Sequence, residues 1–474
     1  MSKVANPARL RWMIVVLAAV WLLHNVGVPP ASASPAADKT YDVVVIGSEI
    51  QGMLLAKEAR AGGLDVLVLD PRPHPGGELI QGKMFFLDDV NDNSKRSLVQ
   101  GEIRTLMKGF KKGSIRKDAD FQNYYNKIAK NLPVKSGITI QSVQQKKQTD
   151  GYTVGSLTYR DRSGAVYTVR SRYWVENTDF AALSSKLKVK RIPGMESLNQ
   201  GKKPDYMAAT YMVKVKNVNW KLLHQAILDD YPLTHVRKKY GPNTYVDWHF
   251  ATGFSNLTNK YQPSSSRLKL RGLNAVDQKD GEVIINGLLV YDVDPSNPAS
   301  VASAMKTAQA EAPAIVQFLR KNIPGFSKAA LNGYPEYLYI RDYNRYETEH
   351  VLNYSDVKGE RMFWDNVSIG GYSVDLQGTR TIPTGIGYGK PDRYGIPLRS
   401  FRLRSYNNVL LAGKNIGADI KAYGSARIMP TTALAAQTMG IILAREQTPL
   451  DRLTRADFVR IHRYLKAEYG IDVR

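Results

Sequence analysis

Residues 41–70, YDVVVIGSEIQGMLLAKEARAGGLDVLVLD, decide the fold class of this chain. Residues 43–46 form a short apolar run typical of a buried parallel strand, Gly47 ends it, and residues 50–61 have the spacing and composition of a helix. The free N–H groups at the start of that helix would hold a pyrophosphate. Asp70, at the end of a second apolar run, is placed to accept hydrogen bonds from a ribose hydroxyl. We therefore predict a dinucleotide-binding unit.

One position in the turn departs from the G-x-G-x-x-G pattern of such units. Gly47 and Gly52 fit, but Glu49 stands where glycine normally lets the backbone approach a phosphate. A carboxylate there would repel an anion unless it is turned away or neutralised. On this stretch alone, an ordinary strand, turn and helix without a ligand is the alternative.

Two further stretches carry a resemblance to a known family. Residues 71–77, PRPHPGG, follow Asp70 and end in a glycine pair. Residues 408–444, NVLLAGKNIGADIKAYGSARIMPTTALAAQTMGIILA, contain a buried strand ended by Gly413 and a helix opened by Pro430. With these motifs in order, the region after Lys39 resembles the FAD-dependent oxidoreductase family with the glutathione-reductase-like FAD-binding fold.

The resemblance implies FAD as cofactor, with the start of the second helix near the electron-rich end of the flavin. The strand over residues 138–143 is expected to return to the cofactor sheet, whereas Asn177 and Asp179 depart from the small-Thr-Gly turn of the family. The residues assigned to FAD binding are Gly47, Glu49, Gly52, Asp70, Gly76, Gly77, Val143, Gly413, Asn415, Arg427 and Thr431.

Candidates for the active centre are Arg341, Arg345 and Tyr372. The two arginines lie in a basic, acidic and basic run that resembles a family strand next to the flavin ring, where they would orient a carboxylate or stabilise a developing negative charge. Surface ion pairs are the alternative for both. Tyr372 lies in a glycine-rich stretch that a plain turn explains nearly as well. No metal site is expected, because the histidines lack metal-ligand spacing and the chain has no cysteine.

The pattern predicts an α/β chain with two interleaved domains. A Rossmann-like FAD-binding domain with a parallel sheet would comprise residues 41–200 and 341–474. An inserted α+β substrate domain with an antiparallel sheet would comprise residues 201–340, because residues 211–215, 268–275 and 283–290 read as strands and residues 301–321 as a helix.

Residues 1–33 read as a signal peptide, so we expect export to the extracellular space or the cell envelope. Three cations precede an apolar run over residues 12–23, and Ala31, Ser32 and Ala33 suit signal peptidase. A retained anchor is the alternative, although the run is shorter than the ~20 residues that span a bilayer. No arginine pair precedes the run, so export of the unfolded chain would require FAD to be captured outside the cytoplasm.

The chain is strongly basic, with a formal charge of +23. Subtracting the three cations of residues 1–33 leaves +20, so the excess belongs to the mature chain. Adhesion to an anionic cell wall or membrane surface explains the charge best, an acidic substrate is a second explanation, and nucleic acid lacks a recognisable binding motif.

Three functional hypotheses remain open from the sequence. The first is an exported FAD-dependent oxidoreductase, a dehydrogenase or oxidase, that takes a hydride from a small-molecule substrate. The second is a basic, wall-associated binding protein on a flavoprotein scaffold with weak or lost FAD binding. The third is a lyase or isomerase that uses FAD structurally.

Overall fold

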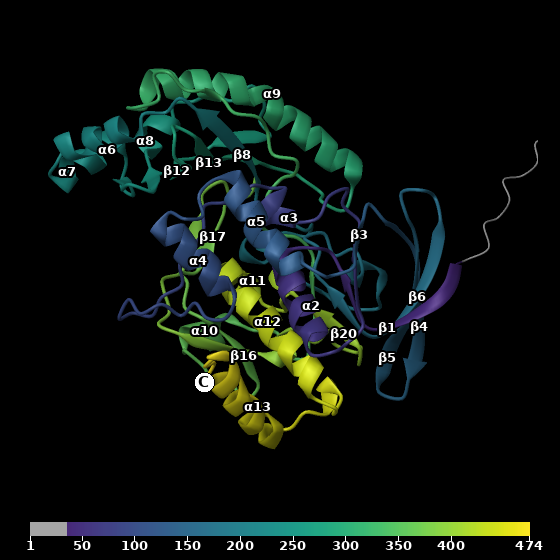
Figure 1. The fold of residues 1–474 in the computed structure, drawn as a ribbon. Helices are drawn as coiled ribbons and strands as arrows, with labels where there is room; N and C mark the ends of the chain where they lie inside the picture. The colour runs from purple at the N-terminus through teal and green to yellow at the C-terminus, as the bar shows by residue number, and fades with distance from the viewer. Residues whose placement is uncertain (1–35) are drawn as a thin grey trace, which may run out of the picture.

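The computed structural model describes residues 36–474, and Figure 1 shows how its elements are arranged. The predicted signal peptide, residues 1–33, lies outside the described residues. A large hydrophobic core draws on both ends of the described chain, and a second core is confined to residues 209–340. The predicted fold class is confirmed, because one mixed sheet is mainly parallel and a separate sheet is antiparallel. The predicted domain boundaries at residues 200 and 340 stay predictions.

The mainly parallel sheet has the strand order β3-β2-β1-β6-β5-β4, with β20 paired to β6. β1 lies between β2 and β6 and is parallel to both, so its apolar residues 43–46 are covered on both faces. β20 comes from the C-terminal motif and runs parallel to β6, which brings the two halves of the cofactor unit into one sheet. The strands are β1 (Ala36–Ile46), β2 (Val66–Asp70), β3 (Val134–Ser136), β4 (Thr139–Gln148), β5 (Gly151–Arg160), β6 (Val166–Glu176) and β20 (Val409–Leu411).

Two helices start at the carboxyl ends of these strands and pack together. α2 (Ile50–Ala61) has the predicted bounds and is followed by Gly62. α12 (Met429–Arg445) is buried from Met429 to Leu443 and lies beside α2 in the centre of Figure 1. Gly440 permits this contact, because a Cβ there would clash with the backbone oxygen of Leu55 in α2. Both helix starts therefore face the same end of the sheet.

The remaining helices are divided between the two sheets. They are α3 (Gly77–Ile80), α4 (Ile103–Lys112), α5 (Asp118–Ala129), α6 (Trp220–Asp229), α7 (Leu233–Tyr240), α8 (Ser255–Thr258), α9 (Pro298–Asn322), α10 (Tyr354–Lys358), α11 (Ile420–Ala426) and α13 (Arg455–Tyr469). Of these, α6 to α9 lie beside the antiparallel sheet in Figure 1. No helix in residues 36–474 is long and apolar enough to cross a membrane.

The antiparallel sheet has the order β14-β8-β13-β12-β10-β9, with β11 paired to β13, and the long helix α9 arches over it in Figure 1. The predicted strand over residues 283–290 is β13. Residues 337–340 contribute only an isolated bridge, between Thr210 and Tyr339. The strands are β8 (Ala209–Lys216), β9 (Tyr245–Val246), β10 (Phe250–Gly253), β11 (Leu268–Leu270), β12 (Leu273–Asp277), β13 (Val283–Val290) and β14 (Ala330–Leu331).

Short two-stranded ladders complete the structure. They pair β7 (Arg191–Ile192) with β15 (Arg345–Tyr346), β16 (Asn366–Gly370) with β19 (Tyr394–Pro397), and β17 (Asp375–Leu376) with β18 (Ile386–Gly387).

Val143, one of the predicted cofactor contacts, lies on a strand at the edge of the cofactor sheet. Val143 lies on β4, the edge strand of an antiparallel meander rather than a parallel strand. Its register runs through Leu157 and Val169 to Lys39, which is at the opposite end of β1 from Gly47. β4 nevertheless begins close to the end of β2, because the Ile138 N–H donates to the backbone carbonyl of Asp70 over 3.2 Å. Residues 138–143 thus return to the cofactor sheet as predicted, and the assignment of Val143 to FAD binding stays a prediction.

Candidate functional site

A carboxylate fills the turn between β1 and α2. Glu49 is only 3% exposed, and its Oε1 lies 2.7 Å from Nη1 of Arg72. The backbone N–H of Glu78 donates to the second carboxylate oxygen of Glu49 over 2.8 Å. A Cβ built on Gly77 would overlap this carboxylate. Glu49 therefore occupies the space over the Gly76-Gly77 pair, where the resemblance places the cofactor.

The Glu49–Arg72 ion pair belongs to a buried network of charged side chains. Lys414, from the C-terminal motif, pairs with Glu78, and Arg72 also lies 3.8 Å from Asp179. Burial raises the pKa of Asp179 to about 7, and within residues 36–474 neither of its carboxylate oxygens has a hydrogen-bond partner. Burial also acts on Glu49, but the charges of Arg72 and Lys414 outweigh it and lower the pKa of Glu49. The buried charge network comprises Glu49, Asp70, Arg72, Glu78, Asp179 and Lys414.

Asp70 is fully buried at the end of β2, as its place in the pattern predicts, but its carboxylate is engaged within the chain. One oxygen accepts a hydrogen bond from the Ser48 hydroxyl, and the other accepts from the backbone N–H of Arg72 over 2.8 Å. The backbone N–H of Gly76 donates to the Ser48 oxygen over 3.0 Å. A ribose hydroxyl would have to replace one of these donors.

The two cofactor motifs, distant in sequence, meet at the helix starts. Gly47 packs against the backbone of Asn177, and Gly52 packs against the Asn177 side chain, so both glycines allow close packing of α2 on β6. Nε2 of Gln51 donates to the hydroxyl oxygen of Thr432 in α12 over 3.2 Å. The side chain of Asn177 thus fills space that a smaller residue would leave open.

The flavin end assigned by resemblance has polar atoms without partners. Gly413 has a φ of +78°, which glycine adopts freely. Nδ2 of Asn415 donates to the carbonyl of Thr178 over 2.8 Å, so Asn415 joins β20 to the end of β6. In contrast, the Thr431 hydroxyl and Nε of Arg427 are buried with no hydrogen-bond partner among the described residues. These two groups, at the start of α12, are free to bind a ligand.

A cavity of about 80 Å³ adjoins this helix start, and we call it the arginine cavity. Arg427 and Tyr339 line it and also line a smaller hollow with Met429 and Pro430 of α12. Burial, together with the nearby positive charges of Arg271 and Arg427, lowers the pKa of Arg341 to about 10. The charged and tyrosine residues of the lining are Arg271, Arg341, Arg427, Asp88, Asp375, Tyr339 and Tyr372.

The structure divides the predicted catalytic residues. Arg341 and Tyr372 both line the arginine cavity, and the Tyr372 hydroxyl donates to Asp88 over 3.0 Å. Arg345 does not line it, because its guanidinium pairs with Asp342 and stacks 3.8 Å from the ring centre of Tyr423. Arg345 thus forms a buried ion pair, and it lines a different, smaller hollow together with Arg341 and Asn415. Its assignment to the active centre stays a prediction.

Sequence reasoning missed Arg271 and Asp88. Arg271 follows β11 in the antiparallel sheet, and Asp88 lies in a loop after α3. Neither residue belongs to a motif, and only the packing of the two sheets brings them to α12. The one sequence signal for Arg271 was its position between two apolar strands, in the segment predicted to bind the substrate.

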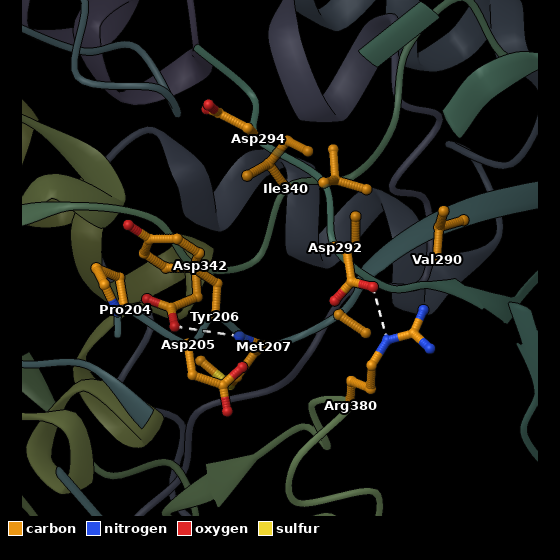
Figure 2. A pocket seen from close by; sticks show the side chains of 13 residues that line it. Pro204, Asp205, Tyr206, Met207, Val290, Asp292, Asp294, Ile340, Asp342 and Arg380 are labelled. Carbon is orange, nitrogen blue, oxygen red and sulfur yellow. Dashed lines mark hydrogen bonds and ion pairs between the residues drawn. The ribbon is translucent and has the colours of Figure 1, made fainter. Parts of the chain in front are cut away.

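Figure 2 shows a second cavity, of about 260 Å³, whose lining is rich in carboxylates. Asp292 pairs with Arg380 over 2.6 Å, and Asp342 accepts from the backbone N–H of Met207 over 3.2 Å. The carboxylate of Asp205 accepts from the hydroxyl of Thr379 over 2.7 Å. Because these carboxylates have partners within the chain, this cavity is the weaker candidate for a charged ligand.

The residues expected to contact FAD suit its flavin end better than its diphosphate. The unpartnered groups of Thr431 and Arg427 suit the flavin end. At the other end the Glu49 carboxylate lies over Gly77, so a diphosphate could bind there only after Glu49 turned away. In the conformation described, the diphosphate seat is closed by the chain's own anion.

Comparisons with known proteins complete the description. Solved structures with similar folds include a geranylgeranyl bacteriochlorophyll reductase-like protein from Thermoplasma acidophilum (13% identity, 91% of this chain and 85% of that chain covered, TM-score 0.37). Others are the FAD-dependent chondrochloren halogenase of a myxobacterium (10%, 91% and 80%, TM-score 0.40) and p-nitrophenol 4-monooxygenase from Pseudomonas putida (11%, 91% and 86%, TM-score 0.39). These likenesses are too distant to indicate a substrate.

A search of curated proteins finds no match. The family model of FAD-dependent oxidoreductases, in contrast, matches residues 42–450, which include both glycine-rich motifs and the whole antiparallel sheet. The family favours an enzyme over a binding protein that has lost its cofactor. The chain belongs to the FAD-dependent oxidoreductase family, and it is an oxidoreductase with FAD as its cofactor.

Proposed function

We propose that this enzyme is exported and that it oxidises a small molecule at a C–H bond next to oxygen or nitrogen. FAD, when bound, supplies the acceptor for a hydride. The observation that carries the proposal is the arginine cavity at the start of α12. Arg427 and Tyr339 line both this cavity and the hollow at the helix start, so a substrate held there would lie next to the flavin end.

The side chains of the cavity would bind the substrate and accept its proton. Arg341 and Arg427 would orient a polar group of the substrate. Burial raises the pKa of Asp88, and the Tyr372 hydroxyl donates to its carboxylate. Asp88 would therefore accept a proton from a substrate hydroxyl or ammonium group as the hydride leaves.

The test is anaerobic mixing of the purified, FAD-loaded protein with amines, hydroxy acids and sugars, followed through the visible absorption of the flavin. Bleaching by one class supports substrate oxidation. Product formation with no flavin reduction would refute it and would favour a lyase or isomerase. A preparation that remains colourless after incubation with FAD would remove the proposal altogether.

Export and surface attachment are separate parts of the proposal. The charge of +20 outside residues 1–33 supports contact with an anionic wall or membrane surface. Expression of the full chain, followed by fractionation and N-terminal sequencing, should give a secreted or envelope-bound form beginning at Ser34. A cytoplasmic protein beginning at Met1 would contradict export.

A further inference from the structure

Three arginines converge on the arginine cavity without a contacting counter-ion. Arg341 and Arg427 are 3% and 5% exposed, and Arg271 is partly buried. Within residues 36–474, no carboxylate lies within 4.0 Å of any of the three guanidinium groups. A buried charge without a partner is costly, because the interior cannot replace the water that solvated it.

Neutral groups are the partners that these arginines do have. Nη2 of Arg341 donates to the hydroxyl oxygen of Thr210 over 2.8 Å. Nη1 of Arg427 donates to the Tyr339 hydroxyl over 3.2 Å, and its Nε has no partner. Arg271 donates to the side-chain oxygen of Gln377. Neutral acceptors orient the guanidinium groups but do not balance their charge.

The cavity also presents acceptors. Asp88 and Asp375 line it, outside ion-pair distance of the arginines. Oδ1 of Asn286 is buried in the lining without a donor. A complementary ligand therefore carries an anionic group for the arginines and a hydrogen-bond donor for Asn286 or Asp88.

We propose that the arginine cavity is a binding site for a small carboxylate that bears a neighbouring hydroxyl or ammonium group. The guanidinium groups match a carboxylate in geometry as well as in charge. The size of about 80 Å³ limits the ligand to a few heavy atoms. That this ligand is the substrate rests on the proposed function, whereas the binding itself does not.

The experiment compares propionate with propionamide, which have nearly the same shape but differ in charge. Calorimetric titration of the FAD-loaded protein should give propionate an affinity about tenfold or more above that of propionamide. Lactate and alanine, which add a donor, should bind more tightly than propionate, and whichever binds better identifies the donor. Equal binding of propionate and propionamide would overturn the proposal.

Arg271 is the residue to change, because it comes from the antiparallel sheet and none of the cofactor motifs includes it. Arg271→Gln should reduce the preference for propionate several-fold, since Arg341 and Arg427 remain, and should leave FAD affinity unchanged. Arg271→Lys, which keeps the charge, should retain part of the preference and covers the case in which Arg271→Gln fails to fold. Arg237→Gln, in the exposed last turn of α7, is the matched control and should behave as the parent.

The outcomes separate this inference from the proposed function. Carboxylate preference without flavin reduction by any carboxylate would leave the site standing and refute its use in oxidation. Flavin reduction by an uncharged substrate, with unchanged kinetics in the folded Arg271→Gln variant, would overturn the site and leave the oxidoreductase proposal standing.

Discussion

Replacement of Glu49 by glycine should strengthen FAD binding and weaken the fold in the absence of FAD. Glu49 closes the diphosphate seat through its 2.7 Å ion pair with Arg72 and its 2.8 Å hydrogen bond from the Glu78 N–H. FAD must displace this carboxylate, whereas glycine at the same position leaves the seat open. The two effects have opposite signs, which distinguishes them from general damage to the structure.

The magnitude follows from the bonds that are exchanged. Hydrogen bonds to charged groups contribute about 1.5–3 kcal/mol each, so freeing Glu49 costs roughly 3–6 kcal/mol before compensation. Hydration of the released carboxylate and binding of the diphosphate to Arg72 and the Glu78 N–H recover part of that cost. If about half is recovered, Glu49→Gly should bind FAD about 10- to 100-fold more tightly. Without FAD, the variant should lose about 1–3 kcal/mol, because Arg72 keeps Asp70 and Asp179 as neighbours.

The assay is titration of the FAD-free protein, followed by quenching of flavin fluorescence, together with urea unfolding in the absence of FAD. Glu49→Gln keeps the size of the side chain and removes its charge, so its FAD affinity should fall between those of the parent and Glu49→Gly. A folded Glu49→Gly variant that binds FAD no better than the parent would refute the reasoning. It would mean that Glu49 already points away from the diphosphate when FAD binds.

Three further predictions concern stability. Burial raises the pKa of Asp179 to about 7, so the folded chain keeps a proton that the unfolded chain releases above about pH 4. The free energy of unfolding should therefore fall as pH rises between these two values. Asp179→Asn should remove that pH dependence when melting temperatures are compared from pH 5 to 8. Gly440→Ala should lower the free energy of unfolding in urea by about 1–3 kcal/mol, because the added Cβ forces α2 and α12 apart. In the control Gly155→Ala the added Cβ meets only an ordinary contact, so its free energy of unfolding should stay within about 0.5 kcal/mol of the parent. Arg345→Gln should lower the free energy of unfolding by about 3–5 kcal/mol, because it leaves Asp342 buried and unpaired. The protein that still folds should retain its preference for propionate. Loss of that preference would mean that Arg345 contributes to the arginine cavity.

Local patterns predicted the elements that carry the FAD fold. The helix over residues 50–61 has its predicted bounds, because a 3.6-residue apolar period ends at a glycine. The strand over residues 283–290 is buried throughout, as its continuous apolar run indicates. The strand expected over residues 138–143 is β4 of the cofactor sheet, but a short apolar alternation does not reveal that its partner, β5, is antiparallel.

The site was only partly accessible from the sequence. Glu49 was recognised as a departure that would need neutralising, but Arg72, which neutralises it, was not singled out although it lies two residues after Asp70. Arg271 was not found, because its position in the arginine cavity depends on how the antiparallel sheet packs against α12. Motifs identify residues that contact a shared cofactor, whereas residues that contact a particular substrate depend on tertiary packing.

The two clusters of buried charge lie at different ends of the expected FAD site and differ in their affinity for anions. Arg72 has Glu49, Asp70 and Asp179 around it, so its charge is balanced within the chain and an external anion must compete with covalently tethered carboxylates. Arg341 and Arg427 have no contacting carboxylate among the described residues, although Asp88 and Asp375 line the same cavity, so an anion that binds them breaks no ion pair. A small free carboxylate should therefore enter the arginine cavity and leave the buried charge network intact. Only a larger ligand that reaches both ends, as FAD would, gains enough contact at the flavin end to offset the release of Glu49.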